Sequence, residues 1–482
     1  MTHLPNVPTK LFINGEWLSG GNPPLAIYNP ATNEELLTIS QGGANEAQQA
    51  ITAANEAFPI WSALSPKERA EYLFTIADLM EEELENLAKI MTLEQGKPLV
   101  ESTAEIQTAI ENFRWNAAEG QRIYGEIIPS APANHWLAVK QPVGVVAAIT
   151  PWNFPTNMIA RKIAPALAVG CSVILKPSKK TPLSALALSS IFERAQLPKG
   201  VFNLLLGNSK EIGEQLTKSN AVHKLTFTGS TDVGRLLYEQ SATTIKKVSL
   251  ELGGHAPFIV FSDADIPLAV DSLLSAKFRN NGQVCTAPNR IFVHHQVKTA
   301  FTNLLVERIS DVSVGNGLDN PTIGPLIDED GLKKIQYQVQ DAKEHGAKIL
   351  YGGKRLTGDT YQDGFFFEPT IIDLVDQHMK VFYQETFGPV IPIIEFSSTE
   401  QVISLANDTE FGLASYFFSN NLETISTISQ KLDYGMVGVN EMAISNAAIP
   451  FGGVKHSGFG RENGHYGVEE YVDTKLIAIK VN

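Results

Sequence analysis

A regular alternation of short apolar segments with helical segments, between residues 145 and 250, constrains the fold of this chain most. Apolar residues at helical spacing fill the intervals between the apolar segments. Apolar strands that alternate with helices are typical of a parallel sheet covered by helices on both faces. The predicted fold class is therefore α/β, with a doubly wound, Rossmann-type sheet. The predicted strands are residues 145–149, 172–175, 202–206, 223–227 and 247–250, and the predicted helices are residues 158–169, 183–195, 210–218 and 231–241.

A second α/β series begins at residue 257, and no linker, repeat or low-complexity tract separates it from the first. An Asn14-Gly15 turn predicts a hairpin at residues 11–17, and the helices that follow it are interpreted as scaffold. Residues 125–144 and 475–481 are predicted to be extended, and a terminal strand can add to a sheet edge in its own or another subunit. The remaining predictions are helices at residues 45–58, 66–91, 102–124, 266–278 and 297–309, strands at residues 257–261 and 290–294, and further elements of the second series at residues 331–346, 348–351 and 400–407.

The composition excludes several classes of protein. The 482 residues carry a formal net charge of −14, which disfavours nucleic acids and anionic membranes as partners. No apolar run reaches the roughly 18–20 residues that span a membrane, and the N-terminus lacks the pattern of a signal peptide. Two cysteines give no disulfide framework, so we expect a cytoplasmic protein. No metal site is predicted.

Cys285 is one of these two cysteines and lies in a turn rich in Gly and Asn, within residues 277–290. Arg279 and Arg290 are close to it in sequence, and nearby positive charge favours the thiolate, the reactive form of cysteine. A buried structural cysteine is the more frequent outcome for an isolated cysteine. This stretch alone leaves both interpretations open.

Residues that follow the predicted strands of the first series form candidate ligand sites, because the carboxyl ends of parallel strands meet at one edge of the sheet. Gly229 and Ser230 open the segment 229–234, where glycine at a strand-to-helix turn lets a phosphate approach backbone N–H groups. A tightly packed turn explains these glycines equally well. Lys176 follows another strand, and an ordinary surface lysine is the equal alternative.

Asn153 and Glu251 are candidates for chemistry at the same edge. Asn153 lies in residues 150–155, a loop with two prolines, a Trp and a Phe, where its amide would stabilise an oxyanion in a dry environment. Glu251 ends a predicted apolar strand, so burial would raise its pKa and suit it to act as a base. The alternative roles for Glu251 are a helix cap and a surface ion pair.

Taken together and in order, these motifs resemble those of the aldehyde dehydrogenase superfamily along nearly the whole chain. The resemblance implies that Cys285 is the nucleophile, that Asn153 and the Cys285 backbone amide form the oxyanion hole, and that Glu251 activates water. It implies oxidation of an aldehyde through a thiohemiacetal and a thioester on the cysteine. The matching segments are residues 150–155, 176–178, 227–230, 251–254, 282–285, 385–389 and 450–453. The residues that it implies for cofactor binding are Thr150, Pro151, Trp152, Lys176, Ser178, Lys179, Gly229, Ser230, Glu385 and Phe387.

The resemblance also implies a subunit in three parts. Residues 1–124 and 145–254 would bind the cofactor, and residues 255–455 would carry the nucleophile. Residues 125–144, with the C-terminal segment 456–482, would form an arm that joins subunits into a homodimer or a homotetramer.

Arg161, Arg279 and Ser445 resemble the succinate-semialdehyde dehydrogenase branch of the superfamily. Two guanidinium groups and a hydroxyl would bind the distal carboxylate of a short semialdehyde, here succinate semialdehyde. A structural ion pair is the alternative for either arginine, and Arg279 is the stronger candidate. Glutarate or 2-oxoglutarate semialdehyde, or a broad range of aldehydes, are alternative substrates. Glu251 argues against a coenzyme-A-acylating enzyme, and the complete catalytic set argues against a purely structural protein.

Lys179 bears on the choice of cofactor. NAD-preferring relatives commonly have a glutamate at this position, which would repel a 2′-phosphate. A lysine beside Ser178 would instead attract that phosphate. The sequence therefore predicts use of NADP, with some activity on NAD.

Overall fold

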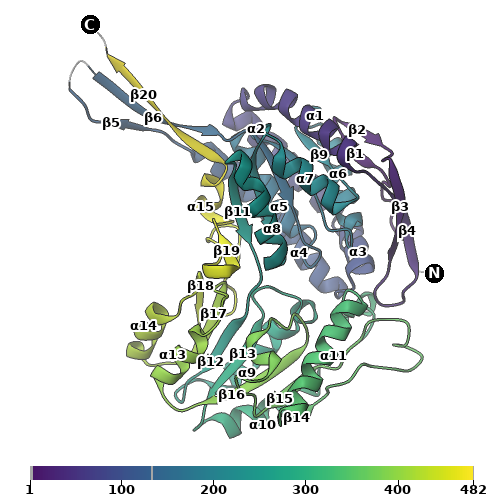
Figure 1. The fold of residues 1–482 in the computed structure, drawn as a ribbon, viewed down its shortest axis with the longest axis vertical. Helices are drawn as coiled ribbons and strands as arrows, with labels where there is room; N and C mark the ends of the chain where they lie inside the picture. Colours follow the sequence, from purple (N-terminus) through teal and green to yellow (C-terminus); the bar gives the residue numbers. More distant parts are fainter. Residues whose placement is uncertain (1–3, 132–133, 481–482) are drawn as a thin grey trace.

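The computed structural model describes residues 4–131 and 134–480. The chain forms two α/β lobes, one above the other in Figure 1, and a narrow arm of strands that projects from the upper lobe. Each of the two predicted α/β series forms a sheet of its own, so both series are confirmed.

The first sheet lies in the upper lobe and has the strand order β19-β11-β10-β7-β8-β9-β1-β2. Its central strands, from β11 to β9, run parallel and match the five predicted apolar segments. The predicted hairpin of β1 and β2 extends one edge in the antiparallel direction, and β19 extends the other. The bounds are β1 (Leu11–Ile13), β2 (Glu16–Leu18), β7 (Val145–Ile149), β8 (Ser172–Lys176), β9 (Phe202–Leu204), β10 (Val222–Thr228), β11 (Lys247–Glu251) and β19 (Gly458–Phe459).

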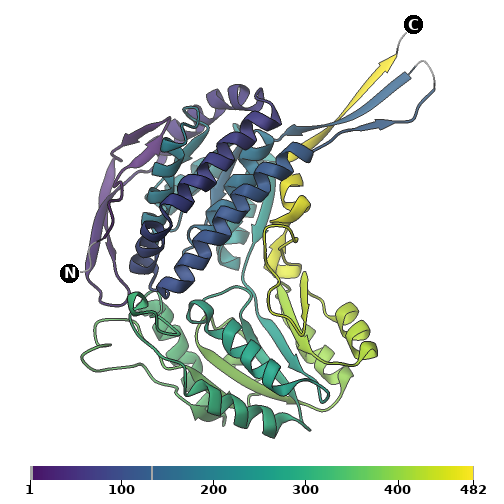
Figure 2. The same cartoon turned by 180° about the vertical axis from the view of Figure 1, so that it is seen from behind.

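Helices cover both faces of this sheet, as the doubly wound prediction requires. In Figure 1, α7 and α8 lie on the near face, and long helices of the first 120 residues, in purple and blue, lie on the near face of Figure 2. The helices of this lobe are α1 (Ala44–Ser62), α2 (Pro66–Glu82), α3 (Leu84–Gln95), α4 (Leu99–Glu119), α5 (Asn157–Val169), α6 (Pro182–Arg194), α7 (Ser209–Lys218), α8 (Thr231–Ser241) and α15 (Gly464–Glu469). A separate pair of strands, β3 (Asn22–Tyr28) and β4 (Glu35–Gln41), follows the hairpin.

The prediction of a single helix at residues 66–91 is wrong, because the chain forms two helices there, α2 and α3. Ser65 and Glu68 form a capping box at the start of α2, with the Ser65 N–H donating to the Glu68 carboxylate at 2.7 Å. The break falls at Glu83, whose ψ of 12° departs from helical geometry. The Glu83 carboxylate accepts hydrogen bonds from Asn86 and Arg194, at 2.8 Å each. The hydrogen bond from Arg194 joins distant parts of the chain, so the local sequence pattern could not predict it.

The second sheet lies in the lower lobe, and its strand order is β14-β15-β16-β13-β12-β17-β18. All neighbouring strands pair in parallel except β14 and β15. Strands β15 to β18 were not predicted, and Pro392 within β16 removes a ladder donor that a central strand normally has. The strands are β12 (Ala256–Val260), β13 (Pro288–His294), β14 (Lys348–Tyr351), β15 (Thr370–Asp373), β16 (Val390–Phe396), β17 (Ala414–Phe418) and β18 (Met436–Val439), and the helices are α9 (Ile266–Phe278), α10 (Lys298–Ile309), α11 (Glu329–Glu344), α12 (Lys380–Tyr383), α13 (Thr399–Asn407) and α14 (Leu422–Lys431).

The cores of the two lobes explain why their strands are almost continuously apolar. In β12, Phe258 and Val260 belong to one hydrophobic cluster and Ile259 to another, so the second sheet is buried on both faces. One larger cluster fills the upper lobe around β7 to β10.

The arm consists of β5 (Glu126–Ile128), β6 (Asn134–Pro142) and β20 (Val472–Lys480). β20 pairs with β6 of the same chain in the antiparallel direction, and β5 pairs with the other edge of β6. The two extended segments predicted here are confirmed, apart from residues 132–133 and 481, which lie outside the described residues. Both views show the arm standing clear of the lobes (Figures 1 and 2).

Among the described residues, no helix combines the length and the apolar character needed to cross a membrane.

Candidate active site

A cavity of about 330 Å³ is lined by both lobes, at the carboxyl ends of the parallel strands of the first sheet. The loops after β7, β10 and β11 line it from the upper lobe. The Cys285 turn, the start of α11 and the segment before β16 line it from the lower lobe. The predicted site residues in its wall are Pro151, Trp152, Asn153, Gly229, Ser230, Cys285, Glu385 and Phe387.

Cys285 reaches the cavity because the chain turns sharply after α9. Asn280 and Asn281 have φ values of 48° and 55°, a left-handed conformation that asparagine adopts more readily than most residues. Gly282 follows with a φ of 75°, and a Cβ at this position would lie 2.2 Å from the carbonyl oxygen of Gly388. The turn therefore requires glycine here, and it brings the cysteine to the cavity wall.

The Cys285 thiol is protonated in these surroundings. Burial raises its pKa to about 12, and the Arg161 guanidinium opposes this rise. The expectation that Arg290 favours the thiolate is wrong, because the buried guanidinium of this residue donates to backbone carbonyl oxygens of α13 at 2.8 and 2.9 Å. A base must therefore take the proton before this thiol becomes a nucleophile.

Asn153 lies in the loop after β7, and its side chain approaches the Cys285 turn. Its Nδ2 donates to the carbonyl oxygen of Gln283 at 2.9 Å, two residues before the cysteine. A side-chain amide has two N–H donors, so the bond to Gln283 leaves one for a group in the cavity. Asn153 is buried, as the apolar loop predicted.

Glu251 is buried at the end of β11, directly before two residues that line the cavity. Its Oε2 atom has no hydrogen-bond partner among the described residues. Burial raises the pKa of this carboxyl well above its usual value, and repulsion from Glu462 adds to the rise, whereas Lys162 and Arg461 oppose it. The predicted direction of the shift is confirmed, and the carboxyl is neither a helix cap nor a surface group.

Arg161 and Ser445 lie in contact, although 284 residues separate them. The guanidinium donates to the Ser445 hydroxyl through Nη2, lies 3.8 Å from the Glu462 carboxylate and stacks over the Phe451 ring at 4.4 Å. Its Nε and Nη1 atoms have no hydrogen-bond partner among the described residues. Burial lowers the pKa of Arg161, and nearby Arg279 lowers it further, while Glu462 opposes both.

Arg279 lies outside this buried group. Its side chain is exposed, and its guanidinium carbon is 4.9 Å from the centre of the Phe154 ring. It lines a neighbouring pocket that also contains Glu101 and Thr322. The structure therefore brings Arg161 and Ser445 together and places Arg279 separately.

The N-terminus of α8 faces the cavity at Gly229 and Ser230, and no side chain of the described residues caps it. Backbone N–H groups at such a terminus bind phosphate. Elsewhere in the wall, the Glu385 carboxylate accepts a hydrogen bond from the Gly254 N–H at 3.1 Å. The rings of Trp152 and Phe387 meet edge to face, with their centres 5.6 Å apart.

Lys176, Ser178, Lys179 and Thr150 lie next to one another, beside the cavity rather than in its wall. The Lys176 ammonium donates to the Ser209 hydroxyl at 2.7 Å, and the Thr150 N–H donates to the Lys176 carbonyl oxygen at 3.2 Å. Burial lowers the pKa of Lys176 to about 8, and the exposed Lys179 adds to this shift. These residues form a positive region at the ends of β7 and β8.

Lys180 and Asp328 were missed by the sequence analysis. They form an ion pair that joins the two lobes at the cavity, and the Lys180 ammonium lies 5.5 Å from the centre of the Trp152 ring. An acidic residue before the element predicted at 331–346 was a signal for a helix cap, and Asp328 does accept from the Gly331 N–H at 3.0 Å. The pairing between lobes has no counterpart in the local sequence.

Comparison with known proteins identifies the family of this chain. Residues 17–477 match the model of the aldehyde dehydrogenase family. A 3-sulfolactaldehyde dehydrogenase of Pseudomonas putida and an NADP-dependent succinate-semialdehyde dehydrogenase of Escherichia coli are each 49% identical to the chain, over 98% of its length and 96% and 97% of theirs. A glutarate-semialdehyde dehydrogenase of Pseudomonas putida is 48% identical, over 98% of both chains.

Solved structures agree with this assignment. The crystal structure of an NADP-dependent enzyme of Escherichia coli superposes with a TM-score of 0.97 at 48% identity, over 99% of this chain and 100% of the other. A succinate-semialdehyde dehydrogenase of Burkholderia pseudomallei superposes with a TM-score of 0.96 at 46% identity, over 98% of both chains. The order of motifs along the sequence, the two-lobed fold and these matches along almost the whole chain lead to one conclusion: the protein belongs to the aldehyde dehydrogenase family.

Proposed function

We propose that this enzyme oxidises succinate semialdehyde to succinate with NADP as the preferred cofactor. The names of three similar proteins specify 3-sulfolactaldehyde, succinate semialdehyde and glutarate semialdehyde. Each of these aldehydes carries an anionic group at a distance from its carbonyl. Acidic short-chain aldehydes are therefore the substrate class that the relatives have in common.

The observation that carries the proposal is the environment of Arg161. This buried guanidinium has two nitrogen atoms without a hydrogen-bond partner among the described residues, one of them 3.8 Å from the Glu462 carboxylate, and it contacts the hydroxyl of Ser445. A buried cation with open donors suits a carboxylate, because charge-assisted hydrogen bonds offset its loss of solvation. Arg279, exposed beside Phe154, is the proposed outer contact that attracts the same carboxylate.

In the proposed mechanism, Cys285 attacks the aldehyde. Glu251 takes the thiol proton through intervening water, since burial raises the pKa of its carboxyl and makes the carboxylate a stronger base than an exposed one. A bond forms between sulfur and the carbonyl carbon, and the carbonyl π electrons move to oxygen. The free N–H of Asn153 and the backbone N–H of Cys285 would stabilise that negative charge. A nicotinamide cofactor in the cavity would supply the acceptor for the hydride that leaves this carbon, and loss of the hydride leaves a thioester on Cys285.

Hydrolysis of the thioester completes the reaction. Glu251 passes the thiol proton to solvent and then takes a proton from a water molecule, whose oxygen attacks the thioester carbon. The tetrahedral intermediate breaks its bond to the sulfur of Cys285 and releases the carboxylic acid, which ionises in water, and Glu251 returns its proton to the thiolate. A raised pKa at Glu251 is what general base catalysis near neutral pH requires.

The residues around the cavity fit a dinucleotide with an extra phosphate. The uncapped N-terminus of α8, at Gly229 and Ser230, would hold the pyrophosphate, and Glu385 would hold the ribose next to the nicotinamide. Thr150, Pro151 and the rings of Trp152 and Phe387 would line the cofactor channel. On the adenosine side, Lys176 and Ser178 would bind the ribose, and the exposed Lys179 would bind the 2′-phosphate.

The subunit architecture is part of the proposal. Residues 1–124 and 145–254 would bind the cofactor, and residues 255–455 would carry the nucleophile. Residues 125–144 and 456–482 would form the arm and C-terminal strand, although β19 also extends the first sheet. Exposed apolar side chains on the arm, among them Ile127, Trp136 and Leu476, favour a homodimer or a homotetramer. The composition, with two free cysteines, favours a cytoplasmic location.

Replacement of Arg161 by methionine tests the substrate. We expect kcat/KM for succinate semialdehyde to fall by about 10–100-fold, because hydrogen bonds to a charged group contribute about 1.5–3 kcal/mol. Activity on propanal, which has no carboxylate, should change little, and Arg279→Ala should show the same selectivity with a smaller loss. Arg69→Met is a matched control, since it removes a buried guanidinium that binds the backbone carbonyls of Leu64 and Ala168.

The control should leave the ratio of the two kcat/KM values unchanged. Equal losses on propanal and succinate semialdehyde in Arg161→Met would refute the carboxylate site. Glutarate semialdehyde belongs in the same panel, because the 48% identical relative carries that substrate in its name. A higher kcat/KM on the longer aldehyde would move the assignment to glutarate semialdehyde.

Lys179→Glu tests the cofactor. In the wild type we expect a higher kcat/KM with NADP than with NAD, and the variant should lower this ratio by at least about tenfold, because it replaces attraction to the 2′-phosphate by repulsion. A wild type that clearly prefers NAD would contradict this part of the proposal.

A further inference from the structure

Lys97 is a buried lysine that contacts the loop of the predicted oxyanion hole, although it is far in sequence from the residues of that loop. Lys97 lies in the turn between α3 and α4, where Gly96 ends α3 in the left-handed conformation and Pro98 precedes α4. The lysine side chain is fully buried, and its ammonium donates to the backbone carbonyl oxygen of Asn153 at 2.7 Å. The helices on both sides were interpreted as scaffold, so the sequence assigned no role to this contact.

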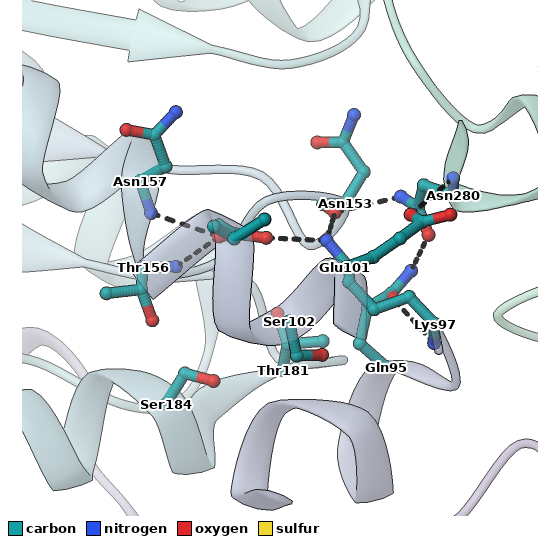
Figure 3. Close-up of polar contacts among 12 residues, drawn as sticks. Gln95, Lys97, Glu101, Ser102, Asn153, Thr156, Asn157, Thr181, Ser184 and Asn280 are labelled. Atoms are coloured by element: carbon teal, nitrogen blue, oxygen red, sulfur yellow. Dashed lines mark hydrogen bonds and ion pairs between the residues drawn. The ribbon is translucent and has the colours of Figure 1, made fainter. Parts of the chain in front are cut away.

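Glu105 fixes the ammonium of Lys97. One carboxylate oxygen lies 2.5 Å from the lysine nitrogen, and the other accepts the backbone N–H groups of Thr156 and Asn157, at 3.0 Å each. These two N–H groups stand at the start of α5, directly after the Asn153 loop. The ion pair therefore links the middle of the loop to its end, and Figure 3 shows the resulting chain of contacts.

Asn280 joins the same carbonyl oxygen to the turn of the nucleophile. Its Nδ2 donates to the Asn153 carbonyl oxygen at 2.9 Å, and its backbone N–H donates to the Glu101 carboxylate at 2.7 Å (Figure 3). Gln95 donates to the Asn280 side-chain oxygen at 2.8 Å and accepts the Lys97 N–H at 3.0 Å. The two loops that carry the reacting groups thus share one buried network with the turn between α3 and α4.

This network fixes the direction of the Asn153 side chain. Its peptide group is held by two donors at the carbonyl oxygen, and its amide is held by the Gln283 carbonyl oxygen. With both ends fixed, the remaining amide N–H has one direction available. Donors and dipoles that are fixed before the reaction stabilise a developing charge without a reorganisation cost. Burial of a charged pair is costly unless its hydrogen bonds are complete. Here the Glu105 carboxylate completes its hydrogen bonds with backbone N–H groups at the end of the Asn153 loop.

We propose that Lys97 is a positioning residue for aldehyde oxidation, which holds the Asn153 peptide so that the side-chain amide points at the oxygen of the reacting carbonyl. This inference rests on the proposed role of Asn153 in the oxyanion hole. Lys97 touches neither the aldehyde nor the thiol, and it acts through Asn153 alone.

A double-mutant cycle between Lys97→Met and Asn153→Ala tests the inference. The measured quantities are kcat and KM for succinate semialdehyde, and the rate at which iodoacetamide alkylates Cys285. Lys97→Met should lower kcat by at least about tenfold, while KM and the alkylation rate stay within about twofold. In the Asn153→Ala background, the same substitution should lower kcat by less than about twofold, because the group that it positions is already absent.

Lys224→Met is the matched control for loss of a buried lysine. The Lys224 side chain is fully buried, and its ammonium contacts Glu470 at 3.2 Å and the Ser249 hydroxyl, away from the Asn153 loop. This control should lower thermal stability but leave kcat within about twofold. If Lys97→Met does not fold, the cycle is measured with Lys97→Met combined with Glu105→Gln, in which no carboxylate is left unpaired.

The outcomes separate the two levels of the proposal. Losses of kcat that multiply in the double variant, or an unchanged kcat in folded Lys97→Met, would overturn the inference about Lys97 alone. An unchanged kcat in Asn153→Ala would overturn the proposed oxyanion hole itself.

Discussion

Cys285 and Cys171 carry the same thiol and share one property, but they lie in very different surroundings. Burial raises the pKa of both to about 12. Cys171 is completely buried directly before β8, in the core of the upper lobe, where its sulfur lies 3.5 Å from the carbonyl oxygen of Tyr471. Cys285 is only partly buried and lines the cavity between the lobes.

The difference lies in what surrounds each sulfur. The charges of Arg161, Glu385 and Glu251 act on Cys285, and Asn153 lines the same cavity. Cys171 belongs to the hydrophobic core of the upper lobe, and the charges that act on it are those of the cations Lys224 and Arg69. The comparison teaches that the pKa of a resting thiol does not identify a nucleophile. Access for a substrate, and a base and a hydrogen-bond donor within reach, distinguish the reactive cysteine from the structural one.

Removal of each thiol gives the largest expected contrast. Cys285→Ala should lower kcat by at least about 1000-fold, because no other group forms the covalent intermediate. Cys171→Ala should keep kcat and lower the free energy of unfolding by about 1–2 kcal/mol, since it leaves a small cavity in a packed core. Steady-state kinetics and denaturant unfolding of both variants measure the contrast. A fully active Cys285→Ala would remove the distinction between the two cysteines.

The second-largest expected effect is the loss of activity when Glu251 is replaced, because this base lies near Cys285 and has no counterpart near Cys171. Glu251→Gln should lower kcat by about 100–10,000-fold, because a neutral amide cannot take the proton of the attacking water. Because Glu251 also takes the thiol proton in the proposed mechanism, rapid mixing should show no burst of reduced cofactor equal in amount to the active sites. A burst retained in the variant would show that another group deprotonates the thiol and that Glu251 is needed only for hydrolysis. A wild-type kcat in the variant would exclude Glu251 as the base.

The smallest expected effect is on the reactivity of the resting thiol. Only the thiolate reacts with iodoacetamide, and a pKa raised to about 12 keeps Cys285 protonated at neutral pH. The alkylation rate should therefore rise with pH from about 7 to about 10 without a plateau, whereas a thiol of ordinary pKa levels off near 9. Arg161→Met should slow alkylation of Cys285 by removing the charge that lowers its pKa, and should not affect Cys171. A plateau near neutral pH would show that the thiolate is already present at rest.

The sequence predicted those parts of the site that depend on one segment at a time. Asn153 and Glu251 follow apolar strands, and parallel strands place such residues at one edge of the sheet. Gly282 and the asparagines before it indicate the turn of Cys285, because a left-handed backbone favours these residue types. The parallel part of the first sheet, and β12 and β13 of the second, followed from the alternation of apolar and helical segments.

Contacts between distant segments were beyond prediction. The bond from Lys97 to Asn153 spans 56 residues, and the contact of Arg161 with Ser445 spans 284. Arg279 was the stronger candidate in the sequence, and only the tertiary structure shows that Arg161 is buried and Arg279 exposed. The pKa of Cys285 also depends on burial in the folded structure, which sequence proximity to Arg279 and Arg290 does not reveal.

Trapping the thioester tests the central claim most directly. Wild-type enzyme is mixed with succinate semialdehyde and NADP, quenched with acid during the first turnover and digested, and the peptides are weighed by mass spectrometry. We predict that the peptide containing Cys285 gains the mass of one succinyl group, that hydroxylamine removes it, and that the peptide containing Cys171 stays unmodified. Formation of reduced cofactor with no acyl group on Cys285, or with the label on another residue, would contradict the assignment of Cys285 as the nucleophile.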